Sequence, residues 1–214
     1  AYDDTIQAEC GLTHVQGLMN GQPGFVATIM ADKIAGLTAL YATVMALFHR
    51  ERTGEGQEVE VGMFETMASF MLAEHASGML FDPPLGPAHY HRVVARNRKP
   101  YKTKDGYVAA LVYNDKHWNA LVTALNLQDL AQDQRFSTRS SRALNMDALD
   151  AAITNITKGF TRDELITLLR RHRAPCAPVQ EIDDVVNDPH LIARGALRNI
   201  NHPLYGPIVV PESP

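Results

Sequence analysis

The sequence predicts an α/β protein, and three patterns along the chain favour that class. Apolar residues recur three and four positions apart between Lys33 and Arg52, which is the period of a helix. Apolar and polar residues alternate over residues 58–63, which is the period of a strand. Beyond Pro100, a short hairpin pattern is followed by further helical patterns. With 45% apolar residues among its 214 positions, the chain can bury a substantial core.

The helix between Lys33 and Arg52 is the strongest local signal. Its apolar stripe consists of Ile34, Leu37, Tyr41, Val44 and Phe48, and Leu40 and Leu47 widen it. Asp32 stands where an N-cap residue belongs, and Gly54 follows the helix as a C-terminal stop. In the strand predicted next, Val59, Val61 and Met63 share one face. A second apolar helix is expected over residues 64–80.

A change in composition divides the chain after this second helix. Residues 81–98 are rich in proline and then in basic residues, which predicts a linker. Residues 101–113 predict a hairpin that turns at Asp105-Gly106, because this pair supplies the positive φ angles of a tight turn. Helices are expected from Asp115 as a cap to Leu125, over 141–158, and over 162–172 behind a Thr161 and Glu164 capping box. Two short helices and weak strands near 197–200 and 208–210 complete the tail.

Composition excludes several classes of function. The formal net charge of −4, with 20 basic and 24 acidic residues spread along the chain, gives no basic footprint for nucleic acid. Cys10 and Cys176 lie far apart, which argues against a disulfide framework and favours a reducing, cytoplasmic setting. The longest apolar run is shorter than the roughly 20 residues of a membrane span, so we expect no membrane segment. His89 and His91 have no third ligand at a suitable spacing, so we expect no metal site.

Asp32 is the first candidate for chemistry, and its position allows two interpretations. As an N-cap it would only satisfy free backbone amides at the helix start. As a nucleophile it would use the same place, because the positive end of the helix dipole keeps a carboxylate ionised. An ionised carboxylate can attack an activated thioester and form a covalent intermediate. The spacing of residues alone leaves both interpretations open.

Several motifs, in order, resemble those of the family III CoA-transferases, the CaiB/BaiF type. The matching segments are Tyr2-Asp3-Asp4-Thr5-Ile6-Gln7-Ala8, Gly11-Leu12, Pro23-Gly24, Ala31-Asp32, residues 50–61 (Arg-Glu-Arg-Thr-Gly-Glu-Gly-Gln-Glu-Val-Glu-Val), Pro100-Tyr101, residues 104–108, residues 175–179 and Asp188-Pro189. In this resemblance Asp32 matches the aspartyl nucleophile, Tyr2 a residue near bound CoA, and Met63 a residue packed close to the nucleophile. It implies CoA transfer between an acyl-CoA donor and a carboxylic acid acceptor through an aspartyl-CoA thioester, with CoA as substrate and no permanent cofactor or metal.

The resemblance also implies an architecture. Residues 1–80 would belong to a large CoA-binding α/β domain, 81–98 to a linker, 99–173 to a small α+β domain, and 174–214 to a segment that returns toward the large domain. Family members form interlaced homodimers, so we expect one here. Upstream sequence that supplies most CoA contacts has no counterpart in this chain, which we therefore expect to be a fragment and inactive alone.

Two other functions remain open from the sequence. An α-methylacyl-CoA racemase would share the fold, the aspartate and the CoA substrate, but it needs a second acid/base on the opposite side of the α-carbon. Relatives of that type carry His-Asp where this chain has Tyr2-Asp3, which favours transfer. Alternatively, the chain is a non-catalytic CoA-binding module in which Asp32 only caps its helix.

Overall fold

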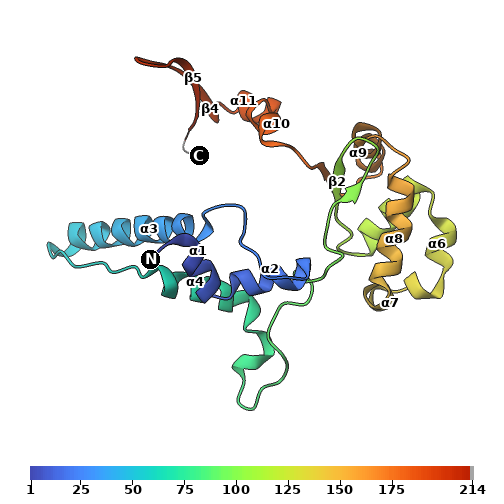
Figure 1. Cartoon of the computed structure of the whole chain (residues 1–214), viewed down its shortest axis with the longest axis horizontal. Helices are drawn as coiled ribbons and strands as arrows, with labels where there is room; N and C mark the ends of the chain where they lie inside the picture. Colours follow the sequence, from blue (N-terminus) through green and yellow to red (C-terminus); the bar gives the residue numbers. More distant parts are fainter. Residues whose placement is uncertain (213–214) are drawn as a thin grey trace. The chain divides into compact units, whose positions relative to one another are not determined.

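The chain, described over residues 1–212 by a computed structural model, folds into two compact units. The first unit comprises Ala1–Arg98 and the second Lys99–Pro214 (Figure 1). Both helices and strands are present, as the predicted α/β class requires. The assignment of these segments to a large CoA-binding domain, a linker and a small domain stays a prediction.

Helices make up the first unit. They are α1 (Asp3–Glu9), α2 (Leu12–Asn20), α3 (Met30–Thr53), α4 (Met63–His75) and the 3-10 helix η1 (Ser77–Leu80). The turn between α1 and α2 places Gly11 at φ 85°, a left-handed conformation that glycine adopts without strain. No element was predicted before residue 30, although Leu12, Val15 and Met19 of α2 recur at helical spacing. The predicted helix 64–80 is confirmed as α4 followed by η1.

The long helix α3 begins earlier than the sequence predicts. Its N-cap is Ile29, and Asp32 is the third residue inside the helix, so the prediction that Asp32 caps it is wrong. The physical reason is that a more distant carboxylate, that of Asp3, already accepts hydrogen bonds from the amides at this helix start. The predicted C-terminal stop is confirmed, since Gly54 follows Thr53 at φ 78°.

The strand predicted over residues 58–63 is absent. Residues 55–62 form neither helix nor strand, and Met63 is the first residue of α4. A strand exists only as part of a hydrogen-bonded ladder. Among residues 1–212, no segment pairs with this one, although its alternating pattern suits a strand.

The apolar stripe of α3 is exposed in this unit. Its large apolar side chains point outward, among them Leu37, Leu40, Tyr41, Val44 and Phe48. Over 18 residues the mean hydropathy of this helix reaches 1.3, so within the described chain α3 alone is long and apolar enough to cross a membrane by length and composition. The sequence-based expectation of no membrane segment considered only uninterrupted apolar runs. A helix can reach a high mean hydropathy even when polar residues interrupt its apolar ones. The buried core of the unit is small and centres on Ile6, Ala31 and Met67.

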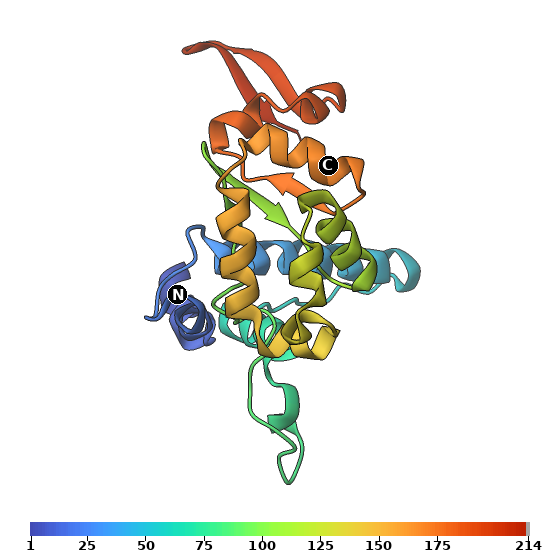
Figure 2. The ribbon, with the colours of Figure 1, turned by 90° about the vertical axis from the view of Figure 1, so that its right-hand side faces the viewer.

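The second unit combines a small antiparallel sheet with helices (Figure 2). The sheet contains β1 (Tyr101–Lys102), β2 (Tyr107–Ala110) and β3 (Cys176–Pro178) in that order. The predicted hairpin is confirmed, with Lys102 paired to Tyr107. Its turn differs in detail, because Gly106 does not have a positive φ and the Thr103 amide donates to the Gly106 carbonyl at 2.9 Å. The third strand was not predicted, since Pro175 and Pro178 suggested only the end of a helix.

The helices of the second unit follow local capping signals. They are α5 (Asp115–Leu125), α6 (Gln128–Gln132), the 3-10 helix η2 (Gln134–Phe136), α7 (Arg139–Leu144), α8 (Met146–Thr157) and α9 (Arg162–Arg171). Asn114 caps α5, one residue before the predicted Asp115. The helix predicted over 141–158 is divided at Asn145 into α7 and α8. The capping box of Thr161 and Glu164 at the start of α9 is confirmed.

A buried apolar cluster holds this unit together. Trp118, Leu121, Phe136, Ile153 and Leu165 are among its buried members. Buried Arg142 lies over the Trp118 ring at 4.9 Å, pairs with Asp115 and donates to the Phe136 carbonyl, so its charge is compensated.

The tail has the predicted elements. They are α10 (Ile182–Val186), α11 (Pro189–Ala193), β4 (Leu197–His202) and β5 (Gly206–Pro211), the last two forming an antiparallel pair. Asp188 caps α11 and Pro189 occupies its first position.

Candidate active site

The site residues predicted from the sequence lie on segments that surround the start of α3. Asp32 is the third residue of α3, Met63 is the first residue of α4, and Tyr2 precedes α1. Met63 packs against the cluster that contains Ala31, the residue before Asp32. Tyr2 adjoins Asp3, whose carboxylate binds the start of α3. The three residues therefore lie on elements that meet at one helix end.

A carboxylate from α1 supplies the cap of α3. Asp3 Oδ1 accepts hydrogen bonds from the Ala31 amide at 2.7 Å and from the Asp32 amide at 3.2 Å. The first amides of a helix lack partners within the helix, so an acceptor here satisfies groups that would otherwise need water. Asp3 is 8% exposed, which leaves water little access to these amides. The cap is thus buried and comes from a residue 29 positions earlier.

Gln7 fixes this cap in place. It is fully buried, and its amide nitrogen donates to Asp3 Oδ2 at 2.5 Å and to the Thr28 carbonyl at 3.3 Å. Its amide oxygen accepts from the Val26 amide at 2.9 Å. Both ends of this side chain are therefore bonded, which ties the loop before α3 to the helix that carries Asp3.

The environment of Asp3 favours its ionised form. Burial alone would raise the pKa of the Asp3 carboxyl. The hydrogen bonds from Gln7 and from the Asp32 and Ala31 amides, together with the charge of Lys33, outweigh burial and lower this pKa from its ordinary value. Asp3 is accordingly a charged helix cap at neutral pH.

The Asp32 side chain has a different environment. It is exposed, and among residues 1–212 its carboxylate makes no hydrogen bond or ion pair. It lies in the first turn of a 24-residue helix, where the dipole favours a negative charge. The arrangement therefore presents an exposed carboxylate that does not cap the helix backbone.

Tyr2 and Met63 are placed differently from each other. Tyr2 is 84% exposed, so its ring is available to a ligand or a further part of the protein. Met63 is half-buried and packs beside Ala31 and Met67, which supports the helix end that carries Asp32. Their roles toward CoA stay predictions.

Sequence reasoning missed the parts played by Asp3 and Gln7. Both lie in the motif of residues 2–8, which by itself indicates no role for either side chain. Their spacing of four residues on a helix was the available signal, because it brings two side chains onto one face. The distant partners at Ala31 and Val26 have no comparable sequence signal.

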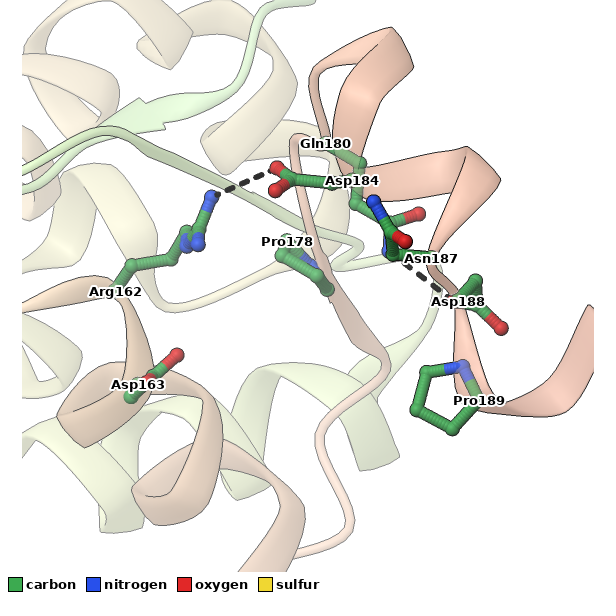
Figure 3. A pocket seen from close by; sticks show the side chains of 8 residues that line it. All are labelled: Arg162, Asp163, Pro178, Gln180, Asp184, Asn187, Asp188 and Pro189. Carbon is green, nitrogen blue, oxygen red and sulfur yellow. Dashed lines mark hydrogen bonds and ion pairs between the residues drawn. The ribbon is translucent and has the colours of Figure 1, made fainter. Parts of the chain in front are cut away.

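A separate polar hollow lies in the second unit. It has a volume of about 280 Å³ and is lined by Arg162, Asp163, Pro178, Gln180, Asp184, Asn187, Asp188 and Pro189 (Figure 3). Across it Arg162 faces Asp184 at 3.7 Å, and Gln180 donates to Asp188 at 3.2 Å. The polar groups of this hollow thus bind one another. Within the described residues, no group of three His, Cys, Asp or Glu side chains could hold a metal ion.

Comparison with known proteins decides the family. The sequence model of CoA-transferase family III matches residues 1–214, which is the whole chain. The chain belongs to CoA-transferase family III. A succinyl-CoA:mesaconate CoA-transferase of Haloarcula marismortui is 31% identical over 209 residues, covering 95% of this chain and 50% of the relative. A succinate–glutarate CoA-transferase of Agrobacterium fabrum is 26% identical, covering 91% of this chain and 48% of the relative.

Solved structures have the same fold as this family III chain. A CaiB/BaiF family protein from Brucella suis superposes with a TM-score of 0.77 at 28% identity, covering 100% of this chain and 59% of that protein. Rv3272 from Mycobacterium tuberculosis gives a TM-score of 0.79 at 24% identity, covering 100% and 56%. The chain spans about half the length of the curated relatives it matches.

Proposed function

We propose that the complete protein containing this family III chain transfers CoA from an acyl-CoA donor to a carboxylic acid, with Asp32 as nucleophile. One observation carries the proposal: the Asp32 carboxylate is exposed and unbonded among residues 1–212, although it lies in the first turn of α3. Asp3, and not Asp32, accepts the hydrogen bonds that cap α3. Asp32 is therefore available for chemistry.

The reaction follows from carboxylate chemistry. The Asp32 carboxylate attacks the donor thioester carbonyl and expels the CoA thiolate, which leaves a mixed anhydride. The thiolate then attacks the aspartyl carbonyl and releases the donor acid, which leaves an aspartyl-CoA thioester. The acceptor carboxylate attacks this thioester and expels CoA again to form a second anhydride. Attack of CoA on the acceptor acyl carbon releases the new acyl-CoA and regenerates Asp32.

The names of the relatives suggest the substrates. Succinate, glutarate and mesaconate, which those names contain, are short dicarboxylic acids. We extend this class to the present protein, with succinyl-CoA as the donor to be tested first. No metal or permanent cofactor takes part in the proposed reaction.

The surroundings of the site belong to the same proposal. We propose that Tyr2 lies near bound CoA and that Met63 supports Asp32 from the start of α4. The exposed stripe of α3, with Leu40, Tyr41 and Phe48, would pack against the remaining part of the complete protein in a cytoplasmic, interlaced homodimer. The present chain alone would be a poor CoA binder and inactive.

Racemase chemistry has less support from this site. It needs a second acid/base that faces Asp32 from the opposite side of the substrate α-carbon. Asp3 is near in the chain's fold, but its carboxylate is buried and bonded to Gln7, Ala31 and Asp32. Tyr2 stands where the racemase type has histidine. A non-catalytic module has less support too, because Asp32 does not cap α3.

Replacement of the nucleophile tests the proposal. In the complete protein, Asp32→Asn is expected to lower succinyl-CoA to glutarate CoA exchange by more than about a thousandfold, because the covalent route is lost. Asp4→Asn is the matched control, since Asp4 is an exposed carboxylate in the first turn of α1 and is expected to retain exchange. Undiminished exchange by Asp32→Asn would refute the proposal. Deuterium uptake at the α-carbon of a 2-methylacyl-CoA, without CoA exchange, would support the racemase alternative.

A further inference from the structure

We infer that Asp3, held by Gln7, is a positioning residue that keeps the Asp32 carboxylate free and correctly placed to attack the thioester. This inference rests on the proposed function. It adds a role for two residues that do not touch the reacting atoms. The observations that carry it are the hydrogen bonds at the start of α3.

Every amide of the first α3 turn has a partner other than the Asp32 carboxylate. The Met30 amide donates to the Thr28 carbonyl at 2.8 Å, and the Lys33 amide donates to the Ile29 carbonyl at 3.2 Å. The amides between them, those of Ala31 and Asp32, both donate to Asp3 Oδ1. An acidic side chain in the first turn of a helix can accept from free amides there. Here Asp3 occupies the Ala31 and Asp32 amides, so these two are not open to the Asp32 carboxylate.

The same bonds fix where Asp32 sits. Asp3 Oδ1 binds the backbone amide of Asp32 itself at 3.2 Å, so the nucleophile's own main chain is held. Gln7 holds the other oxygen of Asp3 and, through Val26 and Thr28, the loop that leads into α3. Because Asp3 and Gln7 are buried, water cannot readily replace these contacts. A rigid support of this kind is what close alignment with a thioester carbonyl needs.

The orientation of the Gln7 amide makes the arrangement testable. Its nitrogen faces the Asp3 carboxylate and its oxygen faces the Val26 amide. Asp3→Asn keeps an oxygen for the Ala31 and Asp32 amides but places an NH2 group against the NH2 group of Gln7. Rotating the Gln7 amide would repair that contact only by setting its NH2 group against the Val26 amide. The substitution therefore loosens the support without deleting the side chain.

The experiment measures single-turnover acylation of Asp32 in the complete protein, with saturating succinyl-CoA and normalised to the amount of Asp32 that hydroxylamine can trap. Asp3→Asn is expected to slow acylation by about ten- to a hundredfold, as expected for a misplaced reacting group. The KM for succinyl-CoA is expected to change by less than about twofold, because Asp3 does not touch the substrate. Asp4→Asn is the matched control and is expected to acylate at the wild-type rate.

Reversing the polarity of the pair provides the rescue. When Asp3→Asn is combined with Gln7→Glu, the introduced carboxylate can accept from the introduced amide and from the Val26 amide. The links to residue 3 and to Val26 are restored with their polarity exchanged, and only the longer bond to the Thr28 carbonyl is lost. This double variant is expected to acylate at least about tenfold faster than Asp3→Asn, which a merely additive loss would not give. If Asp3→Asn alone does not fold, the double variant is compared with the wild type: acylation within about tenfold of the wild-type rate supports the positioning role, and a folded double variant slower by more than about a hundredfold overturns it.

Different results would contradict the positioning role of Asp3 and the proposed function. If Asp32 is trapped normally but Asp3→Asn acylates at the wild-type rate, the positioning role is wrong and the proposed function stands. A double variant that is no faster than Asp3→Asn also overturns the positioning role. If no variant, wild type included, yields trapped Asp32 while CoA exchange proceeds, the proposed function itself is wrong.

Discussion

Three histidines from three segments of the first unit lie together at the base of the loop that follows α4, where its two ends meet. His14 is on α2, His75 ends α4, and His89 closes the loop by donating its amide to the His75 carbonyl at 2.7 Å. The His89 ring lies 5.6 Å from that of His14 and 6.2 Å from that of His75, between ring centroids. Its Nδ1 is buried and has no partner among residues 1–212. This environment therefore favours the neutral form of the His89 ring.

A pH dependence follows from this arrangement. Burial, then the neighbouring His14, His75 and His91, lower the pKa of His89 below its ordinary 6.5. The unfolded state then binds more protons than the folded state below that value, so stability falls as the pH drops through about 6.5. We expect urea unfolding to show a lower free energy of unfolding at about pH 5.5 than at about pH 7.5.

The control for this prediction is His89→Asn. Asparagine tolerates the positive φ of 83° at this position and does not titrate. The variant is expected to lose less stability between the two pH values than the wild type does. Equal losses in both proteins would contradict the role of His89.

At the same scale, the candidate site was only partly predictable. Asp32 could be named as a candidate because a carboxylate at the start of a long helix is visible in the sequence, and the resemblance of the surrounding motifs to family III assigned it the role of nucleophile. Its expected capping role could not be corrected from the sequence, because the true cap, Asp3, lies on another helix. Side-chain partners distant in sequence depend on tertiary packing, which residue spacing does not encode.

Among the elements, α9 contributes three buried side chains, those of Leu165, Ile166 and Leu169, to the core of the second unit. Leu165 is 1% exposed and packs in the apolar cluster that contains Trp118. We expect Leu165→Ala to lower the free energy of unfolding by about 2–5 kcal/mol, because the truncation leaves a cavity in a packed core. Trp118 is the single tryptophan of the chain, so its fluorescence during urea unfolding reports on this unit.

The matched control is Leu144→Ala in the same unit. Leu144 ends α7 and is 87% exposed, so its truncation should change the free energy of unfolding by less than about 0.5 kcal/mol. Similar shifts of the fluorescence transition in the two variants would contradict the assigned core.

Elements with local signals were predicted well, and elements that depend on partners were not. The helices α3, α4, α5 and α9 and the β1–β2 hairpin carry their own apolar periods, caps or turn. The strand expected over 58–63 lacks a ladder partner in the described chain, and β3 forms because β2 offers it an edge. The break at Asn145 between α7 and α8 was also not predicted; there the Asn145 side chain donates to the Arg135 and Ser141 carbonyls.

In the molecule as a whole, the two units differ in how much of their apolar surface is buried. The second unit has an extensive buried cluster, whereas the first buries little beyond Ile6, Ala31 and Met67 and exposes the apolar stripe of α3. The chain also spans about half the length of its relatives. A solvent-exposed stripe of this size is typical of a surface that another part of an assembly covers. The proposed function accordingly belongs to the complete protein.

Trapping the covalent intermediate is the sharpest test of whether Asp32 is the nucleophile. The complete protein would be incubated with succinyl-CoA, treated with hydroxylamine, digested, and examined by peptide mass spectrometry. The account predicts a hydroxamate on Asp32, with Asp3 and Asp4 unmodified, and no hydroxamate in protein incubated with free succinate. An unmodified Asp32 in protein that exchanges CoA, or a hydroxamate on a different carboxylate, would contradict it.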